Sequence, residues 1–234
     1  MGGKKQIGGL VGENHGTIEN GYASGSVRGT ETDAGGLVGT HYEGVIKKCY
    51  AIGNVTGKGN VGGLVGSNRS RSLGYEVGKA GTGKGTILNS YATGNITGEN
   101  NIGGLVGYIF QNKIENSYAT GNVKGNNNIG GLVGFSEGGT GKITNCYSNG
   151  NVIGNNDLGG LVGNTSNQYN DAITNSYYDT QTSEQFDARK GKPMATEDMK
   201  KQNTYSTWDF NRVWIINPDF NDGLPYLRGV GIGK

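Results

Sequence analysis

The two histidines are the residues of this sequence with the most versatile chemistry, because an imidazole can bind a metal or transfer a proton near neutral pH. His15 and His41 lie 26 positions apart, with Glu13 and Glu43 close to them in the sequence. A zinc site needs three or four ligands at characteristic spacings, such as H-E-x-x-H, and the sequence contains no such set. We therefore expect no metal site and no cofactor.

Clustered carboxylates would be the other route to catalysis, because glycoside hydrolases use paired acids on one face of the fold. The acidic residues in the glycine-rich turns, such as Glu99 and Asp157, do not recur at the same place in successive repeats. We therefore expect no catalytic residues and a protein that is not an enzyme.

Basic and aromatic residues gather in one stretch, about residues 68–83, which interrupts an otherwise regular sequence. The candidate ligand-binding residues in it are Arg69, Arg71, Tyr75 and Lys79. Loops extruded from a repeat scaffold often carry binding, and these side chains suit an acidic glycan or an acidic protein patch. The alternative is a solvated excursion without function, because lengthening a loop costs little free energy.

All of these candidates must be positioned by a repeat. The string GGLVG begins at residues 8, 35, 62, 103, 130 and 159, and a phrase similar to NSYATGNV follows each copy. The unit is therefore 27 residues long, with 14 extra residues in the third copy and a small expansion in the fifth. Glycine makes up 47 of 234 residues, and each glycine disfavours a helix interior by roughly 1 kcal/mol.

Each unit contains three short apolar stretches separated by glycine, which predicts three short strands and three glycine corners per unit. One unit cannot bury its own apolar face, so neighbouring units must stack. We predict an all-β fold, a right-handed parallel β-solenoid of about six 27-residue coils, in which Gly8-Gly9 permits a bulge or a close backbone approach. Equivalent side chains then form inward ladders spaced about 4.8 Å apart. The leucine ladder is Leu10, Leu37, Leu64, Leu105, Leu132 and Leu161, and the tyrosine ladder is Tyr22, Tyr50, Tyr91, Tyr118, Tyr147 and Tyr177.

Two further columns of the repeat bear on its chemistry. Cys49 and Cys146 share a column three coils apart, a distance of about 14 Å, which exceeds the Cα separation of about 7 Å that a disulfide tolerates. We expect two free thiols that replace serine. In an asparagine column Lys48 is the exception. Because an unpaired buried lysine is costly, either this column lies at a bend with access to solvent or Lys48 distorts its coil.

The phrase GGLVG followed by I-x-N-S-Y-A-T-G-N-V resembles the GLUG-motif repeat, over about residues 6–182. This resemblance implies a secreted or surface-attached bacterial protein. Members of the family include adhesin-like proteins and non-catalytic regions of IgA-cleaving metallopeptidases, and the repeat itself carries no catalytic residue. We place the repeat domain at residues 1–182.

The composition changes after Thr182, where glycine becomes rarer and both tryptophans appear. We interpret residues 183–234 as a small mixed α/β cap on the end of the solenoid, where unpaired strand edges need cover. Thr196 is the expected N-cap of a helix over about residues 195–202, with Glu197 and Asp198 in its first turn. The alternative is a sugar-binding platform formed by Trp208 and Trp214. The resemblance extends to this segment, since such repeats are often followed by a similar closing segment.

The net charge of +2 and the absence of a basic run argue against nucleic acid as a partner. The sequence contains no stretch of 18 apolar residues, which a transmembrane helix would need, so we expect no membrane insertion. The function that fits is a non-catalytic module of a bacterial surface protein, extracellular or at the cell surface, which acts in adhesion to a host glycan or matrix protein or as a stiff spacer. The alternatives are a non-catalytic region of a secreted peptidase and a filament subunit. The filament would form by end-to-end self-association, because no cap precedes Ile7.

Overall fold

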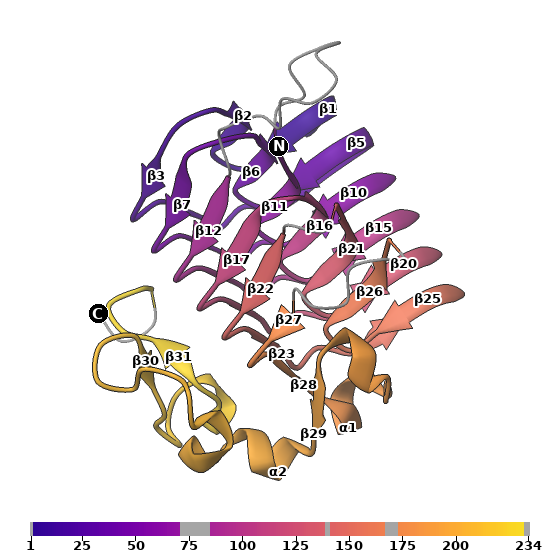
Figure 1. Cartoon of the computed structure of the whole chain (residues 1–234). Helices are drawn as coiled ribbons and strands as arrows, with labels where there is room; N and C mark the ends of the chain where they lie inside the picture. The colour runs from indigo at the N-terminus through magenta and orange to yellow at the C-terminus, as the bar shows by residue number, and fades with distance from the viewer. Residues whose placement is uncertain (1, 71–84, 139–140, 167–172, 232–234) are drawn as a thin grey trace.

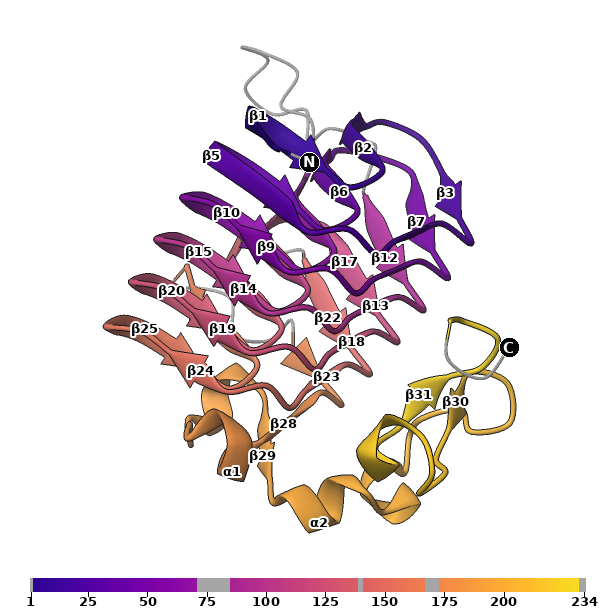
Figure 2. The same ribbon diagram turned by 180° about the vertical axis from the view of Figure 1, so that it is seen from behind.

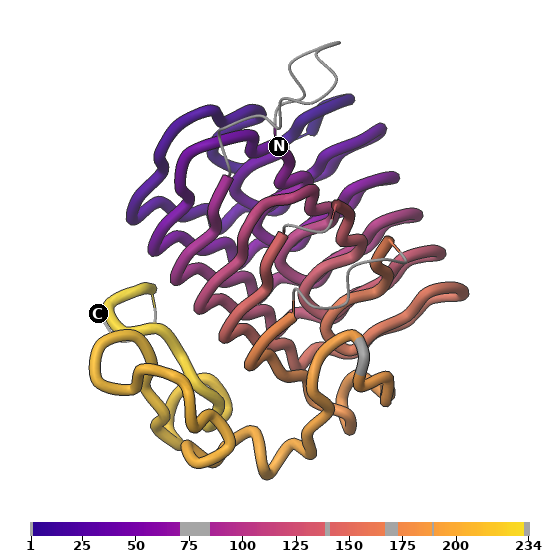
Figure 3. The backbone as a smooth tube through the Cα atoms, viewed as in Figure 1, coloured from indigo at the N-terminus to yellow at the C-terminus, as the bar shows by residue number. Residues whose placement is uncertain are grey.

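The computed structural model describes residues 2–70, 85–138, 141–166 and 173–231. Successive coils stack from β1 (Gly2–Gly8) to β28 (Tyr177–Asp179), and the strands of neighbouring coils pair in parallel (Figure 1). The backbone trace repeats the same path from coil to coil (Figure 3). The predicted parallel β-solenoid of about six coils is therefore confirmed.

Four parallel sheets run along the solenoid, and we name them A to D. Sheet A contains β1, β5 (Val27–Gly35), β9 (Val55–Thr56), β10 (Gly59–Gly62), β14 (Ile96–Thr97), β15 (Asn100–Gly103), β19 (Val123–Lys124), β20 (Asn127–Gly130), β24 (Val152–Ile153) and β25 (Asn156–Gly159). Sheet B contains β2 (Val11–Asn14), β6 (Val38–His41), β11 (Val65–Arg69), β16 (Val106–Phe110), β21 (Val133–Glu137) and β26 (Val162–Thr165). Sheet C contains β3 (Ile18–Glu19), β7 (Val45–Lys47), β12 (Thr86–Leu88), β17 (Lys113–Glu115), β22 (Lys142–Thr144) and β27 (Ile173–Thr174). Sheet D contains β4 (Tyr22–Ala23), β8 (Tyr50–Ala51), β13 (Tyr91–Ala92), β18 (Tyr118–Ala119), β23 (Tyr147–Ser148), β28 and β29 (Lys192–Met194).

A complete coil contains five short strands, not the three that we predicted; β14 to β18 form one such coil. One additional strand arises in sheet A, where the chain runs out along one strand, such as β14, and back along the next, such as β15, to form a projecting arm (Figure 2). The other arises at a bend that divides sheet C from sheet D. The arm has its own apolar core, in which the valine or isoleucine of the first strand packs with that of the second, as Val55 and Val61 illustrate. The main core lies between sheets B, C and D.

Residues in the left-handed backbone region form the bend between sheets C and D, where we predicted a continuous strand from Ile18 to Tyr22. These residues have φ between 46° and 56° and are Asn20, Lys48, Asn89, Asn116, Asn145 and Asn175. Asparagine tolerates this conformation because its short amide can hydrogen-bond locally. The asparagine column therefore lies at a bend, which decides between the two interpretations of Lys48 in favour of the first.

Lys48 has φ 52° without the compensation that asparagine has, so replacing it should stabilise the protein. We expect Lys48→Asn to raise the free energy of unfolding by about 0.5–1 kcal/mol, measured by urea denaturation. Lys124→Asn is the control, because it makes the same change of charge on an exposed strand residue whose φ is not positive. An equal gain in the control would contradict this explanation.

The glycines of the repeat allow close approach between backbones, which we predicted only for Gly8-Gly9. In the left-handed region the described glycines include none from the GGLVG strings. A Cβ on Gly63 would overlap the carbonyl oxygen of Gly104 in the next coil and lie 2.7 Å from the Cβ of Ala92. Sheet D and the connection between sheets A and B therefore pack almost backbone to backbone, which requires glycine on one side and a small residue on the other.

The leucine ladder lies in the main core, where the members from Leu37 to Leu161 are fully buried. The tyrosine ladder faces outward, although we predicted that it would face inward. Its rings stack with centroids 4.9–5.2 Å apart from Tyr22 to Tyr147. The inward prediction assumed one continuous strand from Ile18 to Tyr22, but the left-handed residue between them resets the alternation. Alanine then points inward from sheet D.

The C-terminal segment covers two different surfaces of the solenoid. Helix α1 (Thr180–Ser183), the 3-10 helix η2 (Ala188–Lys190) and β29 lie at the end of the coil stack (Figure 1). The remaining elements, α2 (Thr196–Met199), η3 (Gln202–Tyr205), β30 (Trp214–Ile215), η4 (Asn221–Gly223) and β31 (Tyr226–Leu227), pack along the side, against the tyrosine ladder. The predicted helix over 195–202 is wrong in length, and its N-cap is Ala195, which makes no side-chain cap bond.

Candidate functional site

Most of the variation in the length of the repeat occurs at one edge of the solenoid, where sheet B connects to sheet C; we call it the variable edge. The exception is one extra residue in β5, where three residues separate Arg28 from Thr32 and two separate their register partners Thr56 and Gly59. Its connections are residues 15–17, 42–44, 70–85, 111–112, 138–141 and 166–172. The connections from sheet C to sheet D have two residues in every coil, as in 20–21 and 116–117, and those from sheet D to sheet A have three, as in 24–26 and 120–122. The variable edge is thus the place where the scaffold admits extra chain.

The insertion that we predicted to bind a ligand belongs to this edge. Arg71, Tyr75 and Lys79 lie outside the described residues, so the structure places only Arg69 of the four candidates. Both stems of the insertion are bonded to the next coil: Ser70 N donates to the carbonyl of Phe110 and Gly85 N donates to Asn112 Oδ1. The coils on either side therefore keep their register through the insertion.

Arg69, which lies immediately before the insertion, forms an ion pair with the buried carboxylate of Asp33. Its Nη2 lies 2.5 Å from Asp33 Oδ2, and the carboxylate also accepts hydrogen bonds from Thr40, Asn60 and Ser67. Asp33 is only 5% exposed, so the guanidinium supplies the charge that its burial requires. The structure therefore gives Arg69 a role in anchoring the stem of the insertion.

Asp33 also ends a ladder of side-chain amides that crosses the coils. Asn164 donates to Asn128, Asn128 to Asn101, Asn101 to Asn60, and Asn60 to Asp33, over 2.7–2.9 Å. Each amide is both donor and acceptor, so a carboxylate is the natural acceptor at the end of the chain. The ion pair with Arg69 is thus linked through hydrogen bonds to the last coil.

Two aromatic residues lie beside this ion pair on the outer face of sheet B. The guanidinium carbon of Arg69 is 5.9 Å from the centre of the Tyr108 ring, and Phe135 is the next ring along the sheet. Tyr108 donates its hydroxyl to Glu137 Oε2 at 2.7 Å, and burial together with this carboxylate raises its pKa. These side chains form a partly apolar floor next to the variable edge, which sequence reasoning missed because the residues are specific to individual coils.

His41 and three asparagines form a buried polar cluster behind the variable edge. Asn14 Nδ2 lies 2.9 Å from His41 Nδ1, and Asn112 Nδ2 donates to Asn68 Oδ1 at 2.8 Å. Burial lowers the pKa of His41 to about 4, so this histidine is neutral at physiological pH. His15 stacks instead on Tyr42 at the surface and contacts Glu13, so the two histidines do not share one site.

The buried histidine predicts a loss of stability in weak acid. The pKa of His41 is lower in the folded chain than the unfolded value of 6.5, so the unfolded state binds the proton more tightly. The stabilisation is complete above pH 6.5 and is lost as the pH falls towards 4, by roughly 3 kcal/mol at the conversion of 1.36 kcal/mol per pKa unit. Urea denaturation from pH 7.5 to 4 measures this loss. The variant His41→Asn, which repeats the residue of the next coil, should lose distinctly less stability over this range, and an identical loss would contradict the assignment.

The two cysteines are free thiols, as predicted, and both are buried. Cys146 Sγ donates to the carbonyl of Thr144. Burial raises the pKa of Cys146 to about 12, and it also raises the pKa of Cys49. A thiol is a poor nucleophile in this protonated state. Among the described residues no group of three His, Cys, Asp or Glu side chains is arranged to hold a metal ion.

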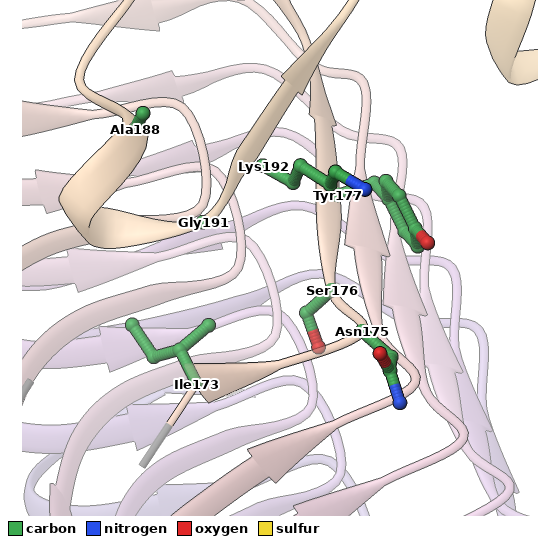
Figure 4. A pocket seen from close by; sticks show the side chains of 7 residues that line it. All are labelled: Ile173, Asn175, Ser176, Tyr177, Ala188, Gly191 and Lys192. Atoms are coloured by element: carbon green, nitrogen blue, oxygen red, sulfur yellow. The ribbon is translucent and has the colours of Figure 1, made fainter. Parts of the chain in front are cut away.

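A cavity of about 370 Å³ lies where the next rung of sheet C would follow β27 (Figure 4). Its lining includes Ile173, Ser176, Tyr177 and Lys192, with the ammonium of Lys192 5.5 Å from the centre of the Tyr177 ring. Ser176 Oγ donates to the carbonyl of Thr174 and accepts from Cys146 N, so this hydroxyl bridges backbone groups. The cavity pairs no general base with a nucleophile among these residues.

The tryptophans are buried and do not form a sugar-binding platform. Trp214 is fully buried and Trp208 is 6% exposed, and both rings pack against Tyr147 of the tyrosine ladder. Trp208 Nε1 donates to the carbonyl of Asn175 in the last bend, which fixes the segment to the solenoid. Their role is the structural one that we gave to residues 183–234, although they cover the side of the solenoid and not its end.

The two ends of the solenoid differ in their exposure. Leu10 and Tyr22 in the first coil are 53% and 60% exposed, whereas Leu161 and Tyr177 in the last coil are 0% and 4% exposed. At the last coil the Tyr178 ring fills the space beside Gly160, and Lys190 Nζ donates to the carbonyl of Gly163. The first coil therefore presents apolar side chains and strand edges that the described residues leave uncovered.

Comparison with known proteins gives one partial relative and one family. A segment of 49 residues is 45% identical to a protein of Evansella cellulosilytica that is provisionally named as a Gly-rich membrane protein. The match covers 20% of this chain and 6% of that protein, so the chain corresponds to a small part of its relative. No solved structure matches the chain, and no helix among the described residues is long and apolar enough to cross a membrane.

The family comparison identifies the repeat itself. Residues 4–28, 30–56, 98–124 and 125–153 each match the family described as "The GLUG motif". These four segments coincide with coils of the solenoid, and they include the columns of leucine, tyrosine and asparagine that build its ladders and bends. The chain is a GLUG-motif repeat protein.

Proposed function

We propose that this chain is a rigid, non-catalytic module of a bacterial cell-surface protein that displays its variable edge to a host glycan or matrix protein. The observation that carries the proposal is the concentration of the large differences in length at one edge of a coil that is otherwise constant to within one residue. A scaffold that only fills space has no reason to concentrate variation, whereas binding repeats place their insertions on one face. The insertion at residues 70–85 is the longest of these connections.

The stiffness of the scaffold supports this function. The leucine core, the stacked tyrosines and the amide ladder each run through successive coils without interruption. A loop that leaves such a scaffold from anchored stems loses less entropy on binding than a loop on a mobile support. The ion pair between Arg69 and Asp33 provides that anchor at the N-terminal stem of the insertion.

The location at the cell surface is supported by the partial relative, whose name places it in a membrane. The same solenoid would also serve as a stiff spacer, and its continuous ladders favour that role as the second candidate. An end-to-end filament has less support, because head-to-tail stacking would require α1, η2 and β29 to leave the last coil.

The experiment is a binding array of glycans and host-matrix proteins probed with the intact chain and with a chain that lacks residues 71–84. The fourth coil shows how to close the gap, because Gln111 and Asn112 make the same connection there with φ 58° at Gln111. Joining Ser70 to Gly85 therefore restores the shorter coil, and Ser70→Gly relieves the left-handed bend. Urea denaturation checks that this variant retains the stability of the scaffold.

A second variant separates the side chains from the length of the insertion. It replaces Arg71, Tyr75 and Lys79 with serine and keeps the full length of the insertion. We expect both variants to lose at least tenfold in affinity for any ligand that the intact chain binds. Absence of any ligand for the intact chain would refute adhesion and leave the spacer as the function, and unchanged binding by both variants would show that the insertion is not the site.

A further inference from the structure

A second surface hollow lies on the arm, away from the variable edge. It has a volume of about 420 Å³ and is lined by Arg28, Gly29 and Thr30 of β5 and by Thr56, Gly57 and Lys58 at the turn between β9 and β10. We propose that this hollow binds an acidic polysaccharide through its carboxylate or sulfate groups. The inference goes beyond the proposed function, because it assigns a separate site and does not depend on the insertion.

The alternation of the strands brings the two cations together. Val27 and Val55 point into the arm core, so their register-paired neighbours Arg28 and Thr56 point outward on adjacent rungs about 4.8 Å apart. The chain then turns at Gly57, which brings Lys58 to the same side of the hollow. Arg28 and Lys58 are both exposed.

Neither cation is neutralised within the described part of the chain. The ion pairs found there involve other lysines, Arg69 and His15, and no side-chain hydrogen bond is found for Arg28 or Lys58. The nearest carboxylate in sequence, Glu31, is paired with Lys5 at 3.6 Å and so repels an incoming anion less. The hollow is therefore an electropositive surface with donors free to bind an anion.

The hydroxyl groups of the hollow make an anionic sugar the best-fitting ligand. Thr30 donates its hydroxyl to the carbonyl of Gly3, which leaves the lone pairs of its oxygen free to accept from a sugar hydroxyl. The exposed column that begins with Arg28 and Thr56 continues in register through Thr97 to Lys124. A linear chain with repeated anionic and hydroxyl groups matches such a row better than a single small anion does.

The test compares two pairs of cations. The double variant Arg28→Ser/Lys58→Ser removes the charges of the hollow, and Lys113→Ser/Lys142→Ser removes two exposed charges on neighbouring rungs of sheet C. Both variants change the net charge by the same amount, but only the first alters the hollow. The probes are a heparin hexasaccharide, which carries sulfate and carboxylate, a hyaluronan hexasaccharide, which carries carboxylate alone, and neutral maltohexaose.

Isothermal titration calorimetry at two salt concentrations provides the readout. We expect the intact chain to bind at least one acidic probe and not maltohexaose, with at least tenfold weaker binding in the hollow variant and less than twofold weakening in the sheet C variant. Equal weakening in both variants would show non-specific attraction and overturn the proposal, as would the absence of binding to both acidic probes. Tighter binding of a single-stranded oligonucleotide through the same residues would overturn the assignment to a polysaccharide.

The chain that lacks residues 71–84 distinguishes this site from the variable edge. We expect it to bind the acidic probe as the intact chain does, because the hollow lies on sheet A. Binding lost in this deletion but retained in the hollow variant would overturn the site on the arm and support the proposed function of the insertion.

Discussion

Replacing Tyr118 with alanine should lower the free energy of unfolding by about 3–5 kcal/mol, the range for truncation of a buried aromatic side chain. Tyr118 is fully buried between Tyr91 and Tyr147, with ring centroids 4.9 Å and 5.0 Å away, and Trp214 packs on it at 6.1 Å. The substitution leaves a cavity between the solenoid and the segment that covers it. The stacked rings on either side of this cavity are held in place by their own neighbours, so they cannot readily move in to fill it.

Tyr22 is the matched control, because it belongs to the same column but lies at its uncovered end. Its side chain is 60% exposed, and among the described residues it stacks on a single ring, that of Tyr50. We expect Tyr22→Ala to cost less than about 1 kcal/mol, since surface substitutions rarely cost more. Urea denaturation of both variants measures the difference. Similar losses at the two positions would mean that stacking within the ladder, and not cover by residues 195–231, provides the stability.

Replacing Gly121 with alanine should destabilise the protein by at least about 3 kcal/mol, at the upper end of what overpacking costs. A Cβ on Gly121 would overlap the carbonyl oxygen of Gly94 in the preceding coil. Backbone atoms of both coils are fixed by parallel pairing on either side, between β13 and β18 and between β14 and β19, so neither can move away. The new methyl group therefore opens the coil stack at this position.

Gly25 offers the opposite result in the same column of the repeat. It lies in the first coil, where a Cβ would meet no atom within 4 Å, and its φ is not in the left-handed region. Alanine there should leave the stability unchanged or raise it by up to about 1 kcal/mol, because it restricts the unfolded chain. Thermal denaturation of the two variants compares them directly. A large loss at Gly25 would show that this column needs glycine for its backbone conformation and not for close approach.

The amino-acid sequence by itself determined the stacking of this protein. A 27-residue period with leucine, isoleucine and valine in fixed columns can bury its apolar groups only if equivalent positions lie above one another, so the parallel β-solenoid and its leucine ladder follow from the pattern. The same argument anticipated free thiols, because it placed Cys49 and Cys146 three rungs apart. It also drew attention to the insertion, because extra residues are visible in any regular repeat.

Tertiary structure alone decided which way the side chains face and what covers them. Period-two reasoning assumes an unbroken strand, and a single left-handed residue such as Asn116 between Ile114 and Tyr118 reverses the face on which the tyrosine lies. The cover of the tyrosines by Trp208 and Trp214 depends on contacts between residues far apart in the chain, which no local pattern encodes. The hollow on the arm arises in the same way, since Arg28 and Lys58 meet only when two coils are stacked in register.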